Sequence, residues 1–375
     1  MKLNRRSFLK KALAAGSLAA GTGSLLSACS GIRRSDLPDQ TLSEHTLNQL
    51  DKLGNSILYY ASLAPSGHNS QPWYVRVLSQ NEWIIGVDPD RRLPAVDPGN
   101  REVMLSIGAF AENLSIAAGT FGLKAEMEVI ASDPFEQDVI KVTLRKAKPV
   151  DYPLQRITRR MTVKHGYLSN EIKQEDIRAL SEHLKGRLFY FPRGTDHAAC
   201  IEEGAIENFR IQVRRDDAQK ELVQWVRLSN KEAERHRDGL TLEGMEIRGF
   251  KGWFVRNFIN PEDFMKPSFR KQSVDQIAKF ARQGGGWLVI TGEGQTVLDL
   301  CDSGRRFERM ALKARERNIA IQPMTQYLEE ESGLKQIAAE HERRVVPHFV
   351  LRAGYLNTYP EPVSLRRPVS WFVRL

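Results

Sequence analysis

The most specific string in the sequence is Ala64-Pro65-Ser66-Gly67-His68-Asn69-Ser70-Gln71-Pro72-Trp73. Ahead of it, leucines and isoleucines recur at three and four positions between residues 42 and 58, which predicts a helix. After it, residues 73–77 form a short apolar run that is typical of a strand. A helix that ends in Pro-Ser-Gly exposes backbone groups and small side chains, so a flat ring can approach closely, while Asn69 and Gln71 add directional amide hydrogen bonds. The string therefore predicts a binding loop between a helix and a strand.

The rest of the chain carries a faint internal repeat. The apolar run 83–87 is echoed by 287–291, and each is followed by a helical pattern and a later strand-like run. Within the two helical patterns, five positions correspond at a constant offset of 196: Gly108, Glu112, Leu114, Ala118 and Leu123 with Gly304, Glu308, Met310, Ala314 and Ile319. The repeat predicts two related α/β halves, residues 43–148 and 149–375.

The segment between these patterns in the second half is less informative. Residues 200–246 are polar with alternating charge, which is typical of solvated helices. Residues 244–270 mix glycine, proline and aromatic residues, and this segment is either a lid over a planar ligand or a packing loop.

The string from Pro65 to Trp73 resembles the P-S-x-x-N-x-Q-P-W loop of the nitroreductase family, which lines the flavin pocket of those oxidoreductases. The resemblance implies an α+β, nitroreductase-like α-β-α sandwich that binds FMN without a covalent bond. It assigns Pro65, Ser66, Gly67, Asn69 and Gln71 to the cofactor site. His68, which replaces the usual small hydroxyl residue, is interpreted as a hydrogen-bonding residue of the loop rather than a general base.

Two further family elements lie in the second half. Arg160, Thr162 and Lys164 match an R-x-[ST]-x-[RK] pattern expected at a helix start on the ribityl and pyrimidine side of FMN. Arg366 and Arg367 match the basic pair that binds the FMN phosphate, a role suited to a guanidinium fork. Thr325 and Gln326 fall where family members place donors near flavin N5.

The order of these elements departs from that of ordinary nitroreductases, in which the R-x-[ST]-x-[RK] pattern precedes the loop. The reversed order resembles the tandem, Acg-like branch of the family, whose two halves form an intramolecular pseudo-dimer. This implies one complete flavin site per chain, made by residues of both halves. Lys164 and Arg160 are then the candidates for stabilising negative charge on the reduced cofactor.

The resemblance implies an oxidoreductase in which flavin N5 transfers hydride or electron pairs to a small acceptor such as a nitro compound or a quinone. It names no side chain as a catalytic acid or base. A second interpretation is a non-catalytic protein that binds and stores FMN, and a third is a structural lipoprotein with an empty fold. No G-x-G-x-x-G fingerprint in a strand–turn–helix setting indicates a dinucleotide site.

The N-terminus predicts export. Arg5 and Arg6 precede a mild apolar stretch, residues 12–26, which is typical of a twin-arginine signal and too short to span a bilayer. Leu26-Ser27-Ala28-Cys29 resembles a bacterial lipobox and makes Cys29 the candidate lipidation site; the alternative is ordinary cleavage near Ala28. Residues 1–29 are thus predicted to be a signal peptide with a lipobox, and residues 30–42 a tether.

Such a leader predicts a periplasmic or cell-envelope protein, held to the membrane by lipid, that crosses already folded around its cofactor. NAD(P)H is scarce there, so a quinol or a redox protein is the expected electron donor. The sequence indicates neither the oligomeric state nor which membrane holds the protein.

Charge and cysteine content exclude other classes. The 375 residues carry a formal net charge of +9, but five of these positive charges lie in residues 1–28, which contain no acidic residue. The remaining +4 gives no footprint for a nucleic acid. Cys200 and Cys301, the cysteines beyond Cys29, lack metal-ligand spacing; they are expected to be buried or incidental, with a single disulfide between them as the alternative.

Overall fold

The computed structural model describes residues 31–37, 50–333 and 346–374, and it contains two sheets with the same strand order. The first runs β1-β2-β4-β3 and the second β5-β8-β10-β9, and every one of these pairings is antiparallel. The strands of the first sheet are β1 (Trp73–Ser79), β2 (Glu82–Val87), β3 (Leu123–Val129) and β4 (Asp138–Lys146). Those of the second are β5 (Leu188–Pro192), β8 (Gly286–Gly292), β9 (Ile319–Pro323) and β10 (Val346–Tyr355). The shared topology confirms the α+β class and the two related halves.

A pair of long helices joins the halves. Helix α4 (Arg101–Thr120) connects β2 to β3, and α12 (Val297–Glu316) connects β8 to β9 in the same way. They pack against each other at Gly108 and Gly304, where a methyl group on either glycine would overlap a backbone carbonyl of the other helix, at Cys301 or Leu105. Glycine at both positions of the repeat therefore lets the two backbones touch.

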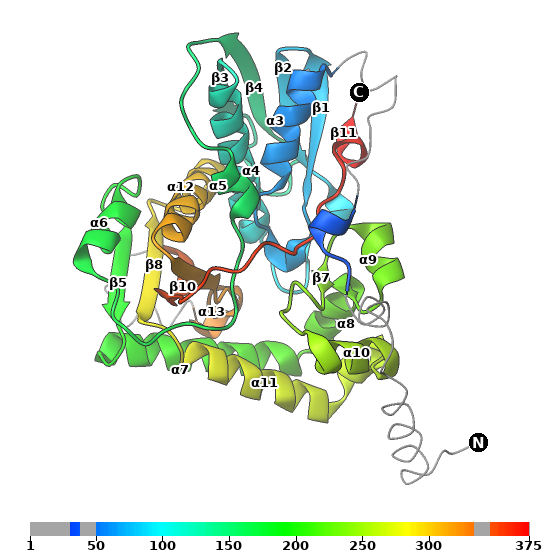
Figure 1. The fold of residues 1–375 in the computed structure, drawn as a ribbon, viewed down its shortest axis with the longest axis vertical. Coiled ribbons are helices and arrows are strands. Elements are labelled where there is room, and N and C mark those ends of the chain that lie inside the picture. The colour runs from blue at the N-terminus through cyan, green and yellow to red at the C-terminus, as the bar shows by residue number, and fades with distance from the viewer. Residues whose placement is uncertain (1–30, 38–49, 334–345, 375) are drawn as a thin grey trace, which may run out of the picture.

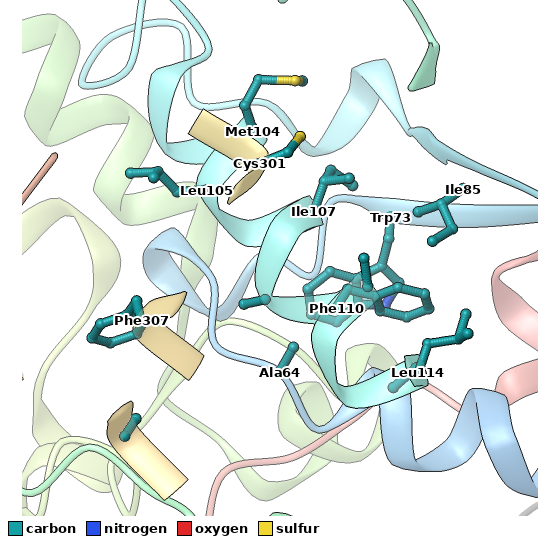
Figure 2. Packing of buried hydrophobic residues seen from close by; sticks show 14 of the residues in the cluster. Ala64, Trp73, Ile85, Met104, Leu105, Ile107, Phe110, Leu114, Cys301 and Phe307 are labelled. Atoms are coloured by element: carbon teal, nitrogen blue, oxygen red, sulfur yellow. The ribbon is translucent and has the colours of Figure 1, made fainter. Parts of the chain in front are cut away.

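The core follows this helix pair. Figure 2 shows the buried residues of α4 between α12 and the first sheet, with Phe110 beside Trp73 at a ring distance of 5.0 Å. On the other side, Phe307 of α12 stacks on Phe349 of β10 at 4.3 Å. Among the described helices, α4 is the one long and apolar enough to span a membrane, but most of it is buried inside the protein. Its apolar character is explained by this core position.

The C-terminal arm returns from the second half to the first. After β10, the chain crosses the molecule and ends in β11 (Val373–Arg374), which pairs in parallel with β1 (Figure 1). The arm carries Arg366 and Arg367 past the loop that precedes β1. Residues of the second half thereby become neighbours of the Pro65–Asn69 loop.

Between β5 and β8 the chain forms a mostly helical insertion at the lower edge of Figure 1. The expected polar helices are present, and the segment considered as a lid forms a helix, a 3-10 turn and the start of another helix. The helices are α7 (Asp196–Arg214), α8 (Asp216–Trp225), α9 (Asn230–His236), α10 (Gly249–Phe258) and α11 (Pro267–Ala281), with the turn η5 (Pro261–Met265) and the short strands β6 (Val226–Arg227) and β7 (Leu240–Thr241).

The structure describes two of the cysteines and part of the predicted tether. Cys301 is a buried thiol in α12 and Cys200 is half-buried in α7, so the alternative of a disulfide between them is wrong. Cys29 and residues 1–30 lie outside the described residues. Within the predicted tether, Gly31 is buried and the Arg34 side chain donates to the Thr158 carbonyl.

Candidate functional site

The loop after α3 (Lys52–Ser62) is held in a demanding conformation. Its turn, Gly67–Asn69, places His68 at φ 49° and Asn69 at φ 52°, and Gln71 follows at φ 51°. Left-handed conformations of residues other than glycine cost free energy, so the surroundings must hold them. One tie is local, because the Gln71 N–H donates to Ser66 Oγ over 2.9 Å.

Two arginines of the second half supply further ties. Arg160 Nη2 donates to the Leu63 carbonyl over 2.9 Å, and Arg366 Nη2 donates to the Leu63 and Ala64 carbonyls over 3.2 Å each. Arg366 Nη1 also donates to Asn69 Oδ1 over 2.9 Å. Both guanidinium groups therefore satisfy carbonyls that the end of α3 leaves without helical partners.

A buried carboxylate faces this pair of arginines. Glu308 of α12 has a fully buried side chain, and its Oε1 lies 3.3 Å from Arg160 Nε, whose side chain is 6% exposed. Burial raises the pKa of Glu308, while the charges of Arg160 and Arg366 oppose that shift. Burial likewise lowers the pKa of Arg366, and the Arg160 charge adds to the effect. The cluster is a buried charge network at the junction of the halves.

One cleft brings most of the predicted site residues together. Pro65, Ser66, Gly67 and Asn69 of the first half line it together with Arg160, Thr162, Lys164, Thr325 and Arg366 of the second. Apolar side chains make up much of the remaining wall: Leu105, Ala109, Met161, Leu240, Phe307, Pro323 and Phe349. The cleft thus combines apolar walls with a few cationic and hydroxyl groups, as binding sites for small molecules do.

Three predicted residues lie outside this wall. Gln71 is fully buried, donating to the Arg237 carbonyl over 2.9 Å and accepting from the Arg367 N–H over 2.9 Å. The Arg367 guanidinium donates to the Gln71 and Trp73 carbonyls, so this side chain fastens the C-terminal arm to the loop rather than facing a phosphate. Gln326 is buried and donates to the Ala205 carbonyl over 3.4 Å.

The Arg160–Lys164 segment also differs from the expected helix start. Helix α5 (Gln155–Arg159) ends before it, and Arg160 has an extended backbone at ψ 136°. Tertiary partners take the backbone groups that a helix would use: the Lys164 N–H donates to Glu246 Oε1 over 2.8 Å, and the Lys164 carbonyl accepts from Arg352 over 2.8 Å. The segment is therefore a pinned loop along one side of the cleft.

His68 faces the same cleft, a feature that the sequence interpretation did not identify. Burial and the nearby Lys164 charge lower the pKa of His68 to about 4, so its imidazole is neutral at pH 7. Its Nδ1 is buried and has no hydrogen-bond partner among the residues that the structure describes. Burial also lowers the pKa of Lys164, against the opposing charge of Glu246. A neutral imidazole and an ammonium group are thus both available to a ligand.

A pair of acidic residues lies behind the loop. Glu102 of α4 lines the cleft, with Oε1 3.1 Å from Arg101 Nη2 and Oε2 near Gly67. Its carboxyl group hydrogen-bonds with Glu329 of α13 (Gln326–Glu329), and burial raises the pKa of both residues, that of Glu329 to about 7. The two are 227 positions apart in the sequence, so no spacing could have revealed the pair.

This pair predicts a pH dependence of stability. Because the folded protein keeps a proton on Glu329 that the unfolded chain releases above its ordinary pKa of 4.5, the free energy of unfolding should fall as the pH rises from about 4.5, and the contribution of Glu329 to this fall should end near pH 7. The slope is about 1.4 kcal/mol per pH unit where the two states differ by one full proton. Urea unfolding at several pH values would measure it. Glu329→Gln should make this part of the profile less steep, and an unchanged slope in that variant would contradict the assignment.

The repeat places a second cavity where the first half meets α12. Leu298, Cys301, Asp302 and Arg305 line it at the positions that Glu102, Leu105, Ser106 and Ala109 occupy in the cleft, and Met127 and Val129 correspond to Pro323 and Thr325. Here Arg305 stands in place of the small Ala109, and its Nε donates to Glu112 over 2.9 Å. The second cavity therefore has a bulky side chain at this position, and its lining contains no counterpart of the Pro65–Asn69 loop.

Comparison with known proteins supports an oxidoreductase of nitroreductase type. No protein-family model matches the chain. A Mycobacterium tuberculosis protein named "Putative NAD(P)H nitroreductase" is 25% identical over 339 residues, which is 85% of this chain and 90% of that protein. One from Serratia sp. named "Probable NAD(P)H nitroreductase PigM" is 23% identical over 78% of this chain and 86% of its own length. A third, the M. tuberculosis protein "Putative NAD(P)H nitroreductase acg", is 36% identical over 74 residues, 20% of this chain and 22% of its own.

Proposed function

We propose that this protein is an exported, FMN-dependent oxidoreductase of nitroreductase type that passes electrons to a small acceptor such as a nitro compound or a quinone. The observation that carries the proposal is the cleft itself. Two elements almost 100 residues apart in the sequence, the Pro65–Asn69 loop and the Arg160–Lys164 segment, line one cavity between the halves. The similarity to nitroreductases supports the same reaction class.

The residues of the cleft fit FMN. Phe307, Phe349 and Leu105 offer apolar surface to a flat ring, and the buried His68 Nδ1 is a polar atom without a protein partner among the described residues. Bound FMN would supply a two-electron redox group. Around it, Lys164 would place a positive charge, and Thr162 and Thr325 would provide hydroxyl groups. Glu102, whose carboxyl pKa is raised by burial, would lie beside the loop. Arg160 and Arg366 would act chiefly by fixing the loop, with Arg366 Nε left for the ligand.

The electron donor follows from location. The relatives are named for NAD(P)H, but an exported protein meets little of that reductant, so we propose a quinol or a redox protein as donor. No part of the proposal involves a nucleic acid.

The visible spectrum of the purified protein tests the cofactor. We expect a yellow protein with one FMN per chain, because the cavity related to the cleft by the repeat carries Arg305 in place of Ala109 and is not lined by the Pro65–Asn69 loop. Two FMN per chain would contradict the assignment of a single site, and colourless protein that takes up no FMN would reject the proposal. Anaerobic reduction followed by a nitroaromatic or a quinone then tests turnover; flavin that never reoxidises would indicate storage instead.

Export and anchoring are tested on the precursor. Arg5→Lys together with Arg6→Lys should leave the protein in the cytoplasm, because the twin-arginine export machinery recognises the arginine pair. Cys29→Ala should abolish lipidation, which metabolic labelling with a fatty acid would measure. Normal export of the double-lysine variant would reject the twin-arginine signal, and labelled Cys29→Ala protein would reject the lipidation site.

A further inference from the structure

Helix α10 carries an exposed aromatic surface. Phe250 is 78% exposed and Phe254 is 42% exposed, and Phe250 stacks on Trp253 with ring centroids 5.5 Å apart. The opposite side of the helix packs inward, since Gly252 is buried and Val255 contacts a small apolar cluster around Leu242 and Phe264. Large aromatic side chains grouped on one exposed helix face mark a surface that contacts another phase or another molecule.

A basic cavity adjoins the start of this helix. Arg248, the residue directly before α10, lines it together with Arg33, Arg34 and Arg159, and Glu361 is the acidic residue in the lining. Arg33, Arg159 and Arg248 are exposed, and Arg159 pairs with the exposed Glu361 over 3.1 Å, which leaves the cavity with a net positive charge. Arginine side chains in such a group suit phosphate oxygens, which they can bind in a bidentate manner.

The described chain begins beside the same helix. Gly31 is buried against the Glu243 carboxylate, and Glu243 Oε1 accepts from Arg256 of α10 over 2.9 Å. Cys29, the predicted lipidation site, is two residues before Gly31, and two residues of extended chain span about 7 Å. A lipid on Cys29 would therefore hold the membrane surface close to α10 and to the basic cavity.

We propose that α10 and the basic cavity of Arg33, Arg34, Arg159 and Arg248 form a docking surface for the anionic face of a phospholipid bilayer. The aromatic side chains lie at the level of the headgroups, and the arginines bind lipid phosphates. An interfacial aromatic helix with neighbouring basic residues is a known means of holding a protein against a membrane alongside a lipid anchor.

This orientation has a consequence for the proposed redox function, and only that consequence rests on the redox assignment. Gly244, which lines the cleft, is five residues before the start of α10, and Arg34 lines both the cleft and the basic cavity. The cleft therefore adjoins the proposed docking surface, and a lipid-soluble quinol would have a short path to it.

Tryptophan quenching in vesicles tests the docking surface. The full chain is reconstituted in phosphatidylcholine vesicles with and without phosphatidylglycerol, each containing acyl-brominated lipid. The Trp253 signal is obtained as the difference from a Trp253→Phe variant. We expect a twofold or greater loss of this emission in anionic vesicles. Such a loss corresponds to Trp253 lying at the depth at which interfacial helices are buried. A Phe135→Trp variant is the control. Phe135 lies in the β3–β4 connection and is 55% exposed, and the emission of the tryptophan introduced there should not be quenched.

The outcomes separate the docking surface from the anchor and from the enzyme. Absence of Trp253 quenching in vesicle-bound protein, or equal quenching at Phe135→Trp, would overturn the proposal. Equal quenching without phosphatidylglycerol would overturn the assignment to an anionic surface, and Arg248→Glu with Arg33→Glu should weaken the quenching in anionic vesicles. Because emission and not turnover is measured, the result does not depend on the flavin assignment.

Discussion

Lys164→Ala is expected to weaken FMN binding by about 10- to 100-fold, the loss of one charge-assisted hydrogen bond. Lys164 places its ammonium group in the cleft beside His68, and burial already lowers its pKa. The local backbone should survive the change, because the ties of Lys164 to Glu246 and Arg352 use its N–H and carbonyl. Titration of the apoprotein with FMN, followed by flavin fluorescence, would measure the dissociation constant.

A matched lysine provides the control. Lys173, directly before α6 (Gln174–Ser181), has a side chain that is 72% exposed and lies outside the cleft lining. Lys173→Ala should leave the dissociation constant for FMN unchanged. If Lys164→Ala bound FMN as tightly as the unaltered protein, the cleft would not be the flavin site as assigned.

The fold of two halves could be predicted from the sequence because the residues that repeat are ones that packing restricts to few types. Gly108 and Gly304 are both required where α4 and α12 touch, and Glu112 and Glu308 both receive arginines in the interior. These positions therefore show the same offset of 196 in both halves, although few of the residues around them match. The Pro65–Trp73 string was identified for a different reason, because its residues match a known family motif; the conformation of its turn depends also on Arg160 and Arg366 of the second half.

Roles that depend on distant partners could not be predicted in this way. Arg367 and Gln71 are adjacent only because the C-terminal arm crosses to β1, and their mutual hydrogen bonds use the groups that a ligand would need. The same holds for Glu102 and Glu329, which meet through the fold. The predicted helix start at Arg160 was wrong because Glu246 and Arg352, far along the chain, take the backbone groups of Lys164 in the same segment.

Arg160→Ala is expected to lower the free energy of unfolding by about 3–5 kcal/mol, the cost of leaving one partner of a buried ion pair uncompensated. The Glu308 side chain is fully buried and faces Arg160 at 3.3 Å, and the Leu63 carbonyl would also lose a donor. Urea unfolding of the apoprotein would measure the loss. Because this variant should also lose FMN, flavin content alone cannot distinguish a ligand contact from a collapsed loop.

Two companion variants resolve that ambiguity. Arg160→Ala combined with Glu308→Gln removes the stranded charge and should recover much of the stability. If flavin returns with it, Arg160 acts by compensating the Glu308 charge rather than by contacting FMN. The repeat supplies the control, since Arg309 pairs with Glu112 on the other side of the helix pair but is 41% exposed, and Glu112 keeps Arg305. Arg309→Ala should therefore cost less than about 1 kcal/mol. If Arg160→Ala and Arg309→Ala lowered the free energy of unfolding equally, burial would not be the reason that the Arg160–Glu308 pair contributes to stability.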